Sequence, residues 1–209
     1  DRLSLGVQSG VESELGAISR RHTVSDAERT VKDAKAAGFR NISVDLMLGL
    51  PYQTMRSLEK SIEFALSLDV QHISCYILKL EPGTPLYKLQ KSSPASLSLP
   101  DEDTVADMYL YMSEVLRQNG FLHYEISNFA KAGYSSRHNL KYWNCDEYLG
   151  LGCAAHSYFR NLRFSFKRDI PLFIDAMEAD VSHGGTLTGD GVAMTYDQYK
   201  NAGLVDELY

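Results

Sequence analysis

The chain has 209 residues, of which 44% are hydrophobic and 23% charged, and its formal net charge is −6. These values are ordinary for a globular domain, and a chain of this length buries roughly 70% of its unfolded surface. The acidic balance gives no basic footprint for nucleic acid, and no apolar run approaches the roughly 18 residues that a membrane span needs. We therefore expect a globular protein with neither a nucleic-acid partner nor a membrane span; its oligomeric state stays open.

The first two predicted elements are a strand and a helix. Apolar residues alternate with small and polar ones from residue 3 to residue 8, which predicts a strand. Ser25 and Glu28 form a capping-box pattern, and Gly38 is a typical helix stop, so we expect a helix between them. Alternation returns from residue 41 to residue 46 and predicts a second strand.

Strands and helices continue to alternate along the chain. Apolar residues at helical spacing between 58 and 66 predict a second helix, and a third strand follows from 73 to 77. This order is typical of a parallel sheet with helices packed outside it. A closed eight-unit barrel needs about 250 residues, so the chain holds at most part of one.

The composition changes in the second half of the chain. Residues 88–99 are rich in Ser, Pro and Lys and predict a linker or surface loop. An amphipathic helix is expected from Asp101 to Gly120, and strand-like patterns cover 121–129 and 148–166. The fold class that follows is α/β with a smaller, mixed second part.

Polar residues lie at or beyond the ends of the three predicted strands, where parallel α/β folds bind ligands. They are Gln8, Asp45 and Lys79. Asp45 could face a ligand or accept hydrogen bonds from the turn at 49–51, and the pattern does not separate these alternatives. Arg20 follows a short helix, where it could favour the helix terminus or grip a carboxylate, and pattern alone favours the first role.

The hexamer from His138 to Trp143 is the most unusual segment, since it combines an imidazole with a tyrosine and the only tryptophan. It shows no evident periodicity. A neutral imidazole beside aromatic rings could bind heme iron, although pattern alone favours a structural histidine.

Two further patterns have weak functional readings. Residues 150–155 match a loose dinucleotide fingerprint, but small residues there more simply permit a close backbone approach. A helix beginning at Cys153 would support nucleotide binding and a nucleotide-dependent oxidoreductase. An extended chain there would exclude this interpretation. The basic cluster of Arg160, Arg163, Lys167 and Arg168 is typical of a solvated strand edge, with small anions or propionates as the alternative.

Cysteine usage limits the metal chemistry. Cys75, Cys145 and Cys153 form no C-x-x-C, C-x-x-C-H or C-x-x-x-C-x-x-C motif. The chain as given therefore cannot hold a cysteine-ligated iron–sulfur cluster or a c-type heme. The histidines also lack the spacings of zinc sites.

Six motifs, taken together, resemble one known family. They are Arg2–Ser9, Val44–Thr54, Glu81–Pro85, His123–Ala130, His138–Trp143 and Tyr148–Gly152. In this order they are similar to the oxygen-independent coproporphyrinogen III oxidase family of radical S-adenosylmethionine (SAM) proteins, and within it to the heme-chaperone branch, HemW. The similarity extends from residue 1 to about residue 180.

The resemblance implies a domain organisation. Residues 1–87 correspond to the C-terminal half of a partial (β/α)6 radical-SAM barrel, 88–180 to an α+β region with the heme-binding motif, and 181–209 to no assigned part. The family's cluster cysteines and glycine-rich SAM motif would precede residue 1. We therefore expect the 4Fe–4S cluster only in the full-length protein, and no 5′-deoxyadenosyl radical from this chain alone. Within the last segment, 187–191 and 201–205 resemble pieces of the family's C-terminal region in the wrong order, so we assign it no function.

The resemblance also implies ligand-binding residues. The family's SAM-contacting glutamine, arginine and aspartate correspond to Gln8, Arg20 and Asp45. Two further SAM positions correspond to Lys79 and His156, where the residue type varies in the family. Arg20 suits the methionine carboxylate. Gln8 and Asp45 suit ribose hydroxyls or the amino group.

The family's heme-binding motif, H-N-x-x-Y-W, is intact in the hexamer. The resemblance therefore favours a heme ligand over a structural histidine at this position. The resemblance implies His138 as the heme-iron ligand, with Tyr142 and Trp143 beside the porphyrin. It implies a heme chaperone that passes heme to acceptor proteins, in the cytoplasm or, for a eukaryotic source, the mitochondrion. The alternative is an oxygen-independent coproporphyrinogen III oxidase that decarboxylates porphyrinogen propionates. No catalytic residue is assigned, and whether the protein is an enzyme stays open.

Overall fold

The computed structural model describes residues 2–93, 97–175 and 205–208. The chain forms two compact units, residues 1–135 and 136–209. The boundary predicted at residue 87 lies inside the first unit, because the chain returns after it to add two strands and a long helix to the same core. Most of the predicted segment 181–209, including 187–191 and 201–204, lies outside the described residues.

A five-stranded mixed sheet forms the centre of the first unit. Its order is β1 (Leu3–Gln8), β2 (Ile42–Leu48), β3 (His72–Ile77), β5 (Asn128–Ala130) and β4 (Leu122–His123). The first three strands are parallel, as predicted, and β5 and β4 continue the sheet in antiparallel pairing. Strand β2 ends two residues later than expected, because Leu48 continues the buried row.

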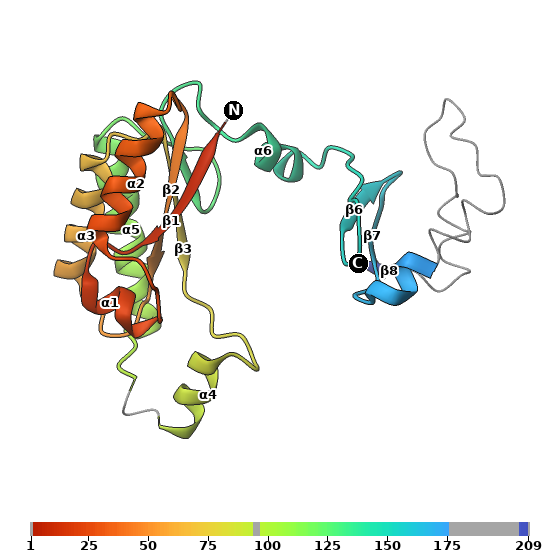
Figure 1. The fold of residues 1–209 in the computed structure, drawn as a ribbon, viewed down its shortest axis with the longest axis horizontal. Coiled ribbons are helices and arrows are strands. Elements are labelled where there is room, and N and C mark those ends of the chain that lie inside the picture. The colour runs from red at the N-terminus through yellow and green to blue at the C-terminus, as the bar shows by residue number, and fades with distance from the viewer. Residues whose placement is uncertain (1, 94–96, 176–204, 209) are drawn as a thin grey trace. The chain divides into compact units, whose positions relative to one another are not determined.

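Helices cover one face of this sheet (Figure 1). The helices of the unit are α1 (Glu12–Ala17), α2 (Val24–Ala36), α3 (Met55–Ser67), α4 (Pro85–Ser92) and α5 (Glu102–Gln118). Apolar residues of α2, α3 and α5 share one core with the strands. Met108, Met112 and Leu116 of α5 are fully buried, which confirms the predicted amphipathic stripe. Each such side chain contributes about 1.5–3 kcal/mol through burial.

The two faces of the parallel strands differ in chemistry. Val44 and Leu46 of β2 point into the helix-covered core and are fully buried. Side chains of opposite parity lie on the other face, where Ser4 and Gly6 are exposed and Asp45 is half-buried. We call this second side the polar face, defined by Ser4, Gly6, Gln8, Ser43, Asp45, Met47, His72, Ser74, Tyr76, Asn128 and Ala130.

Residues 88–92 belong to a helix and not to the predicted linker. Thr84 caps α4 by accepting a hydrogen bond from the backbone N–H of Tyr87, and Pro85 occupies its first turn. Proline is favoured at that position because its missing N–H has no partner there in any helix. The polar segment 88–99 therefore includes the end of a short surface helix, which the composition alone did not predict.

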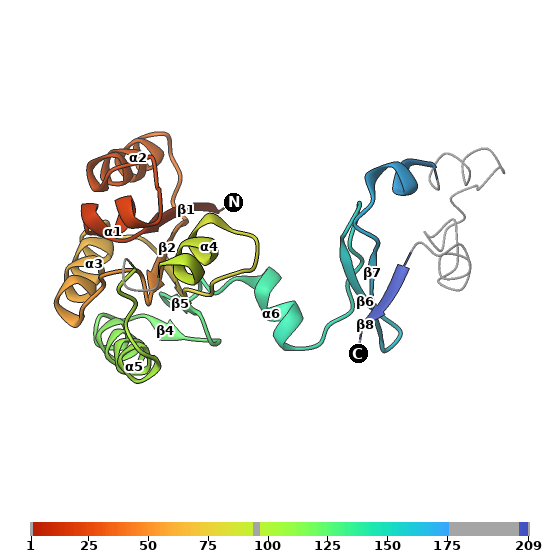
Figure 2. The same cartoon turned by 90° about the horizontal axis from the view of Figure 1, so that it is seen from below.

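The second unit contains a short helix and a small antiparallel sheet (Figure 2). Its elements are α6 (Arg137–Trp143), β6 (His156–Phe159), β7 (Leu162–Phe166) and β8 (Val205–Leu208), with the strand order β6-β7-β8. The strand predicted from residue 148 begins later, and only an isolated bridge joins Tyr148 to Tyr158. A Cβ atom at Gly150 would lie 2.1 Å from the carbonyl oxygen of His156, so the glycine permits the close backbone approach that the sequence predicts.

No helix in the described ranges is long and apolar enough to cross a membrane.

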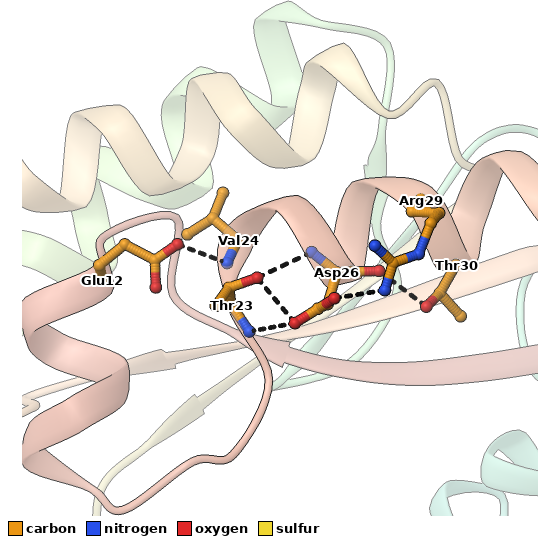
Figure 3. A network of polar contacts seen from close by, with 6 residues as sticks. All are labelled: Glu12, Thr23, Val24, Asp26, Arg29 and Thr30. Carbon is orange, nitrogen blue, oxygen red and sulfur yellow. Dashed lines mark hydrogen bonds and ion pairs between the residues drawn. The ribbon is translucent and has the colours of Figure 1, made fainter.

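The N-terminal cap of α2 differs from the prediction (Figure 3). The Thr23 hydroxyl accepts a hydrogen bond from the backbone N–H of Asp26, and the Asp26 carboxylate accepts one from the backbone N–H of Thr23. The capping box is therefore Thr23 with Asp26, two residues before the predicted Ser25 with Glu28. The hydrogen bonds to Thr23 and Arg29 lower the pKa of Asp26 to about 2.

Substitution of the cap tests this correction. Thr23→Ala is expected to reduce the free energy of unfolding by about 1 kcal/mol, because the first turn of α2 loses a hydrogen-bond acceptor. Ser25→Ala lies within the helix and should change it by less than about 0.5 kcal/mol. Urea denaturation followed by circular dichroism compares the two; a larger loss for Ser25→Ala would restore the original assignment.

Candidate functional site

Gln8 lies at the carboxyl end of β1, on the polar face. Its backbone is in the left-handed region with φ 70°, and only 7% of the residue is exposed. The side chain folds back over Gly6, since a Cβ atom there would lie 2.6 Å from the Gln8 amide nitrogen. Gly6 therefore makes room for the Gln8 amide at the edge of the sheet.

Asp45 is the central residue of β2, and not near its end as predicted, because the strand continues to Leu48. Ser4 Oγ lies 3.5 Å from its carboxylate, and Ser74 also forms a hydrogen bond with it. Burial nevertheless raises the pKa of Asp45 above its ordinary value.

The turn that follows β2 has a different partner from the one considered in the sequence. Gln53 Oε1 accepts hydrogen bonds from the backbone N–H groups of Gly49 and Leu50, at 2.7 and 3.3 Å. The structural alternative for Asp45, a bond to this turn, is therefore wrong. The hydrogen bonds that its carboxylate does accept come from side chains of the neighbouring strands.

Arg20 and Lys79 have exposed side chains on loops that follow the first and third strands. Arg20 lies beyond α1, and Lys79 forms an exposed ion pair with Glu81 at 3.1 Å. The carboxyl ends of parallel strands meet at one edge of a sheet, so both loops leave the sheet on the side of Gln8. His156 belongs to the second unit, where it begins β6 and is exposed.

A buried carboxylate that the sequence analysis missed connects the turns beyond β1 and β2. Glu14 of α1 is 2% exposed, and its Oε2 accepts hydrogen bonds from Ser9 Oγ at 2.6 Å and Gln53 Nε2 at 3.3 Å. Ser9 Oγ also lies 3.2 Å from Ser61 Oγ of α3. Glu14 Oε1 has no hydrogen-bond partner within the described part of the chain. We call Ser9, Glu14, Gln53 and Ser61 the buried tetrad.

A second series of hydrogen-bonded side chains crosses the polar face, and the sequence patterns did not predict it. Ser43 Oγ lies 2.7 Å from His72 Nδ1, and His72 Nε2 lies 2.8 Å from the hydroxyl of Tyr124. His72 is 3% exposed. Its burial, together with the positive charge of Arg2, lowers the pKa of His72 from 6.5 to about 4. The imidazole is therefore neutral near pH 7.

In the second unit, the segment from His138 to Trp143 lies on α6 and is not aperiodic as predicted. The helix begins because Ser136 Oγ accepts a hydrogen bond from the backbone N–H of Asn139. His138 is exposed, and Tyr142 and Trp143 are 45% and 51% exposed.

The three cysteines do not fit an iron–sulfur cluster. Cys75 is fully buried in β3, where burial raises the pKa of its thiol. Cys153 donates a hydrogen bond to the carbonyl of Lys167 at 3.2 Å, and Cys145 is exposed. The described residues contain no group of three His, Cys, Asp or Glu side chains that could hold a metal ion.

The two weak sequence patterns have simple structural outcomes. Cys153 and Ala154 form a turn that leads into the extended strand β6, so the dinucleotide interpretation of residues 150–155 is wrong. The side chains of the basic cluster, Arg160, Arg163, Lys167 and Arg168, are exposed. Arg160 lies over the ring of Phe159, 5.3 Å from its centroid.

Comparison with known proteins gives concordant results. The sequence pattern of the Radical SAM superfamily matches residues 1–65. The heme chaperone HemW of Bacillus subtilis is 45% identical over 163 residues, which are 78% of this chain and 42% of that protein. The mouse protein named radical S-adenosyl methionine domain-containing protein 1, mitochondrial, is 43% identical over 76% of this chain and 36% of its own length. The chain thus spans about two fifths of the curated relatives it matches.

One solved structure has the same fold. Coproporphyrinogen III oxidase HemN from Escherichia coli, a radical SAM enzyme, superposes with a TM-score of 0.68 over 85% of this chain and 43% of its own. Sequence identity is 19%, so the likeness concerns the fold alone. It confirms the prediction of part of a radical-SAM barrel.

The depressed pKa of His72 predicts how stability depends on pH. The unfolded chain binds this proton below about pH 6.5, whereas the folded chain resists it until about pH 4. The contribution of neutral His72 to the free energy of unfolding is therefore fully present above pH 6.5. It is lost as the pH falls towards 4. We expect a loss on the order of 2 kcal/mol between pH 7 and 4.5.

Urea denaturation of the native chain and of His72→Gln across this range measures the effect. The variant should lose less stability on acidification than the native chain, and His123→Gln should retain the native slope. Parallel pH profiles for the native chain and His72→Gln would contradict the assignment.

Proposed function

We propose that this chain, which is 45% identical to a HemW heme chaperone over 78% of its length, is the heme-binding part of a heme chaperone. The observation that carries this proposal is the set of exposed rings on α6. An imidazole, a phenol and an indole lie within seven residues of one helix and are all open to solvent. Large aromatic side chains are usually buried, so three together on a surface indicate a ligand or partner.

These rings suit the chemistry of heme. A neutral imidazole nitrogen of His138 supplies an axial lone pair for iron, and the rings of Tyr142 and Trp143 offer apolar area to a porphyrin face. Heme would be cargo here and not a resident cofactor. An exposed site fits that role, because acceptor proteins must reach the porphyrin.

The polar face is proposed as one wall of the SAM site. Besides Asp45 it carries Asn128, whose Oδ1 is buried without a hydrogen-bond partner among the described residues, so its polar groups are not all satisfied by the chain itself. Gln8 and Asp45 would hold ribose hydroxyls or the amino group, and Arg20 the methionine carboxylate. Lys79 is a further candidate in this unit, whereas His156 belongs to the second unit and is not assigned to this wall.

When bound, SAM would supply a sulfonium group whose carbon–sulfur bond breaks when an iron–sulfur cluster donates one electron to it. The cysteines of this chain do not fit that cluster, and no radical step is assigned to its residues. Their proposed tasks are to orient SAM and to keep its carboxylate and ribose hydrogen-bonded. The 4Fe–4S cluster would belong to the full-length protein.

The proposed partners are heme and heme-acceptor proteins. A cytoplasmic location is proposed for a bacterial source and a mitochondrial one for a eukaryotic source, since the mouse relative is named as mitochondrial. Decarboxylation of coproporphyrinogen remains the alternative activity. Loss of propionate carboxyls during turnover by full-length, cluster-reconstituted protein would favour it over heme transfer.

Heme titration tests the proposal. Hemin added to this chain should give a Soret band characteristic of histidine ligation, and His138→Ala should change the band and weaken binding at least about tenfold. His123→Gln, a histidine substitution in the first unit, is the matched control and should bind like the native chain. Identical spectra and affinities for the native chain and His138→Ala would rule out His138 as the ligand.

A further inference from the structure

The proposed iron ligand already has a partner in this structure. His138 and Tyr142 are four residues apart on α6 and therefore lie on the same side of the helix. The Tyr142 hydroxyl lies 3.0 Å from His138 Nε2. The two rings meet edge to face, with their centroids 5.0 Å apart and their planes at 87°.

The position of the Tyr142 ring is supported from a second direction. Its centroid lies 4.6 Å from that of Tyr148, again in an edge-to-face arrangement at 80°. Such aromatic pairs are favourable beyond the area that they bury. The phenol is thus held between His138 and Tyr148 although nearly half of its surface is exposed.

Iron and the Tyr142 hydroxyl need the same atom. Nε2 is the imidazole nitrogen farther from the backbone, so it can approach the centre of a flat macrocycle with less steric hindrance than Nδ1. A metal needs the Nε2 lone pair, and a hydrogen bond to the hydroxyl occupies that nitrogen in either tautomer. Ligation through Nε2 therefore requires the His138–Tyr142 hydrogen bond to break.

We propose that Tyr142 is a gate that competes with heme iron for His138 Nε2. This inference rests on the proposed heme binding and specifies how that site releases its cargo. Each departure of iron is followed by closure of the hydrogen bond, which shifts the equilibrium towards the heme-free chain. A carrier benefits from such competition, because a very stable complex would not transfer heme to an acceptor.

Removal of one hydroxyl tests the gate. Tyr142→Phe keeps the ring and its contact with Tyr148 but cannot bond to Nε2, so the 209-residue chain should bind hemin about two- to tenfold more tightly. Transfer of hemin to apomyoglobin, followed in the Soret region, should slow by a similar factor. The Soret position should stay unchanged, because the ligand to iron is the same.

Two further variants separate the possible outcomes. Tyr148→Phe also removes a hydroxyl from a neighbouring ring and should leave hemin affinity unchanged. In a His138→Ala background, Tyr142→Phe should lose its tightening effect, because no imidazole remains to be gated. Unchanged or weaker binding by Tyr142→Phe, together with weakened binding by His138→Ala, would overturn the gate alone. Unchanged binding by His138→Ala would overturn the proposed function and the gate with it.

Discussion

The alternation of side chains along three parallel strands is the constraint on which the first unit depends. Residues of one parity, such as Val44 and Leu46, must be apolar because helices seal them from water. Residues of the other parity are free to be polar, and they include Asp45 and Gln8. A shift of one residue in any strand would exchange these two populations, so packing of the core also fixes the identity of the polar face.

The two candidate sites differ in which kind of side chain is placed in an unfavourable environment. On the polar face, acids and amides are partly withdrawn from water, and burial raises the pKa of Asp45. On α6, aromatic rings are kept in water although burial would stabilise them. Both arrangements cost folding free energy that a purely structural sequence would recover. The proposed ligand binding would supply a physical reason to retain them.

Local patterns were sufficient for the three parallel strands and for α5, but not for α4 or α6. Period-two alternation gave the parallel strands, and the apolar stripe of 101–120 gave α5. Glu14 and His72 were missed because each has a partner that is distant in sequence: Gln53 lies 39 residues from Glu14, and Tyr124 lies 52 residues from His72. The start of α6 depends on one hydrogen bond from Asn139 to Ser136, which a search for hydrophobic periodicity does not detect.

The buried tetrad has a consequence for how this sequence can vary. Replacement of Glu14 by an apolar residue deprives Ser9 and Gln53 of an acceptor, while replacement of either partner strands a carboxylate in the interior. Each single change is therefore unfavourable, even where a combined change to an apolar set would be tolerated. We therefore expect substitutions at these four positions to be correlated among homologous sequences.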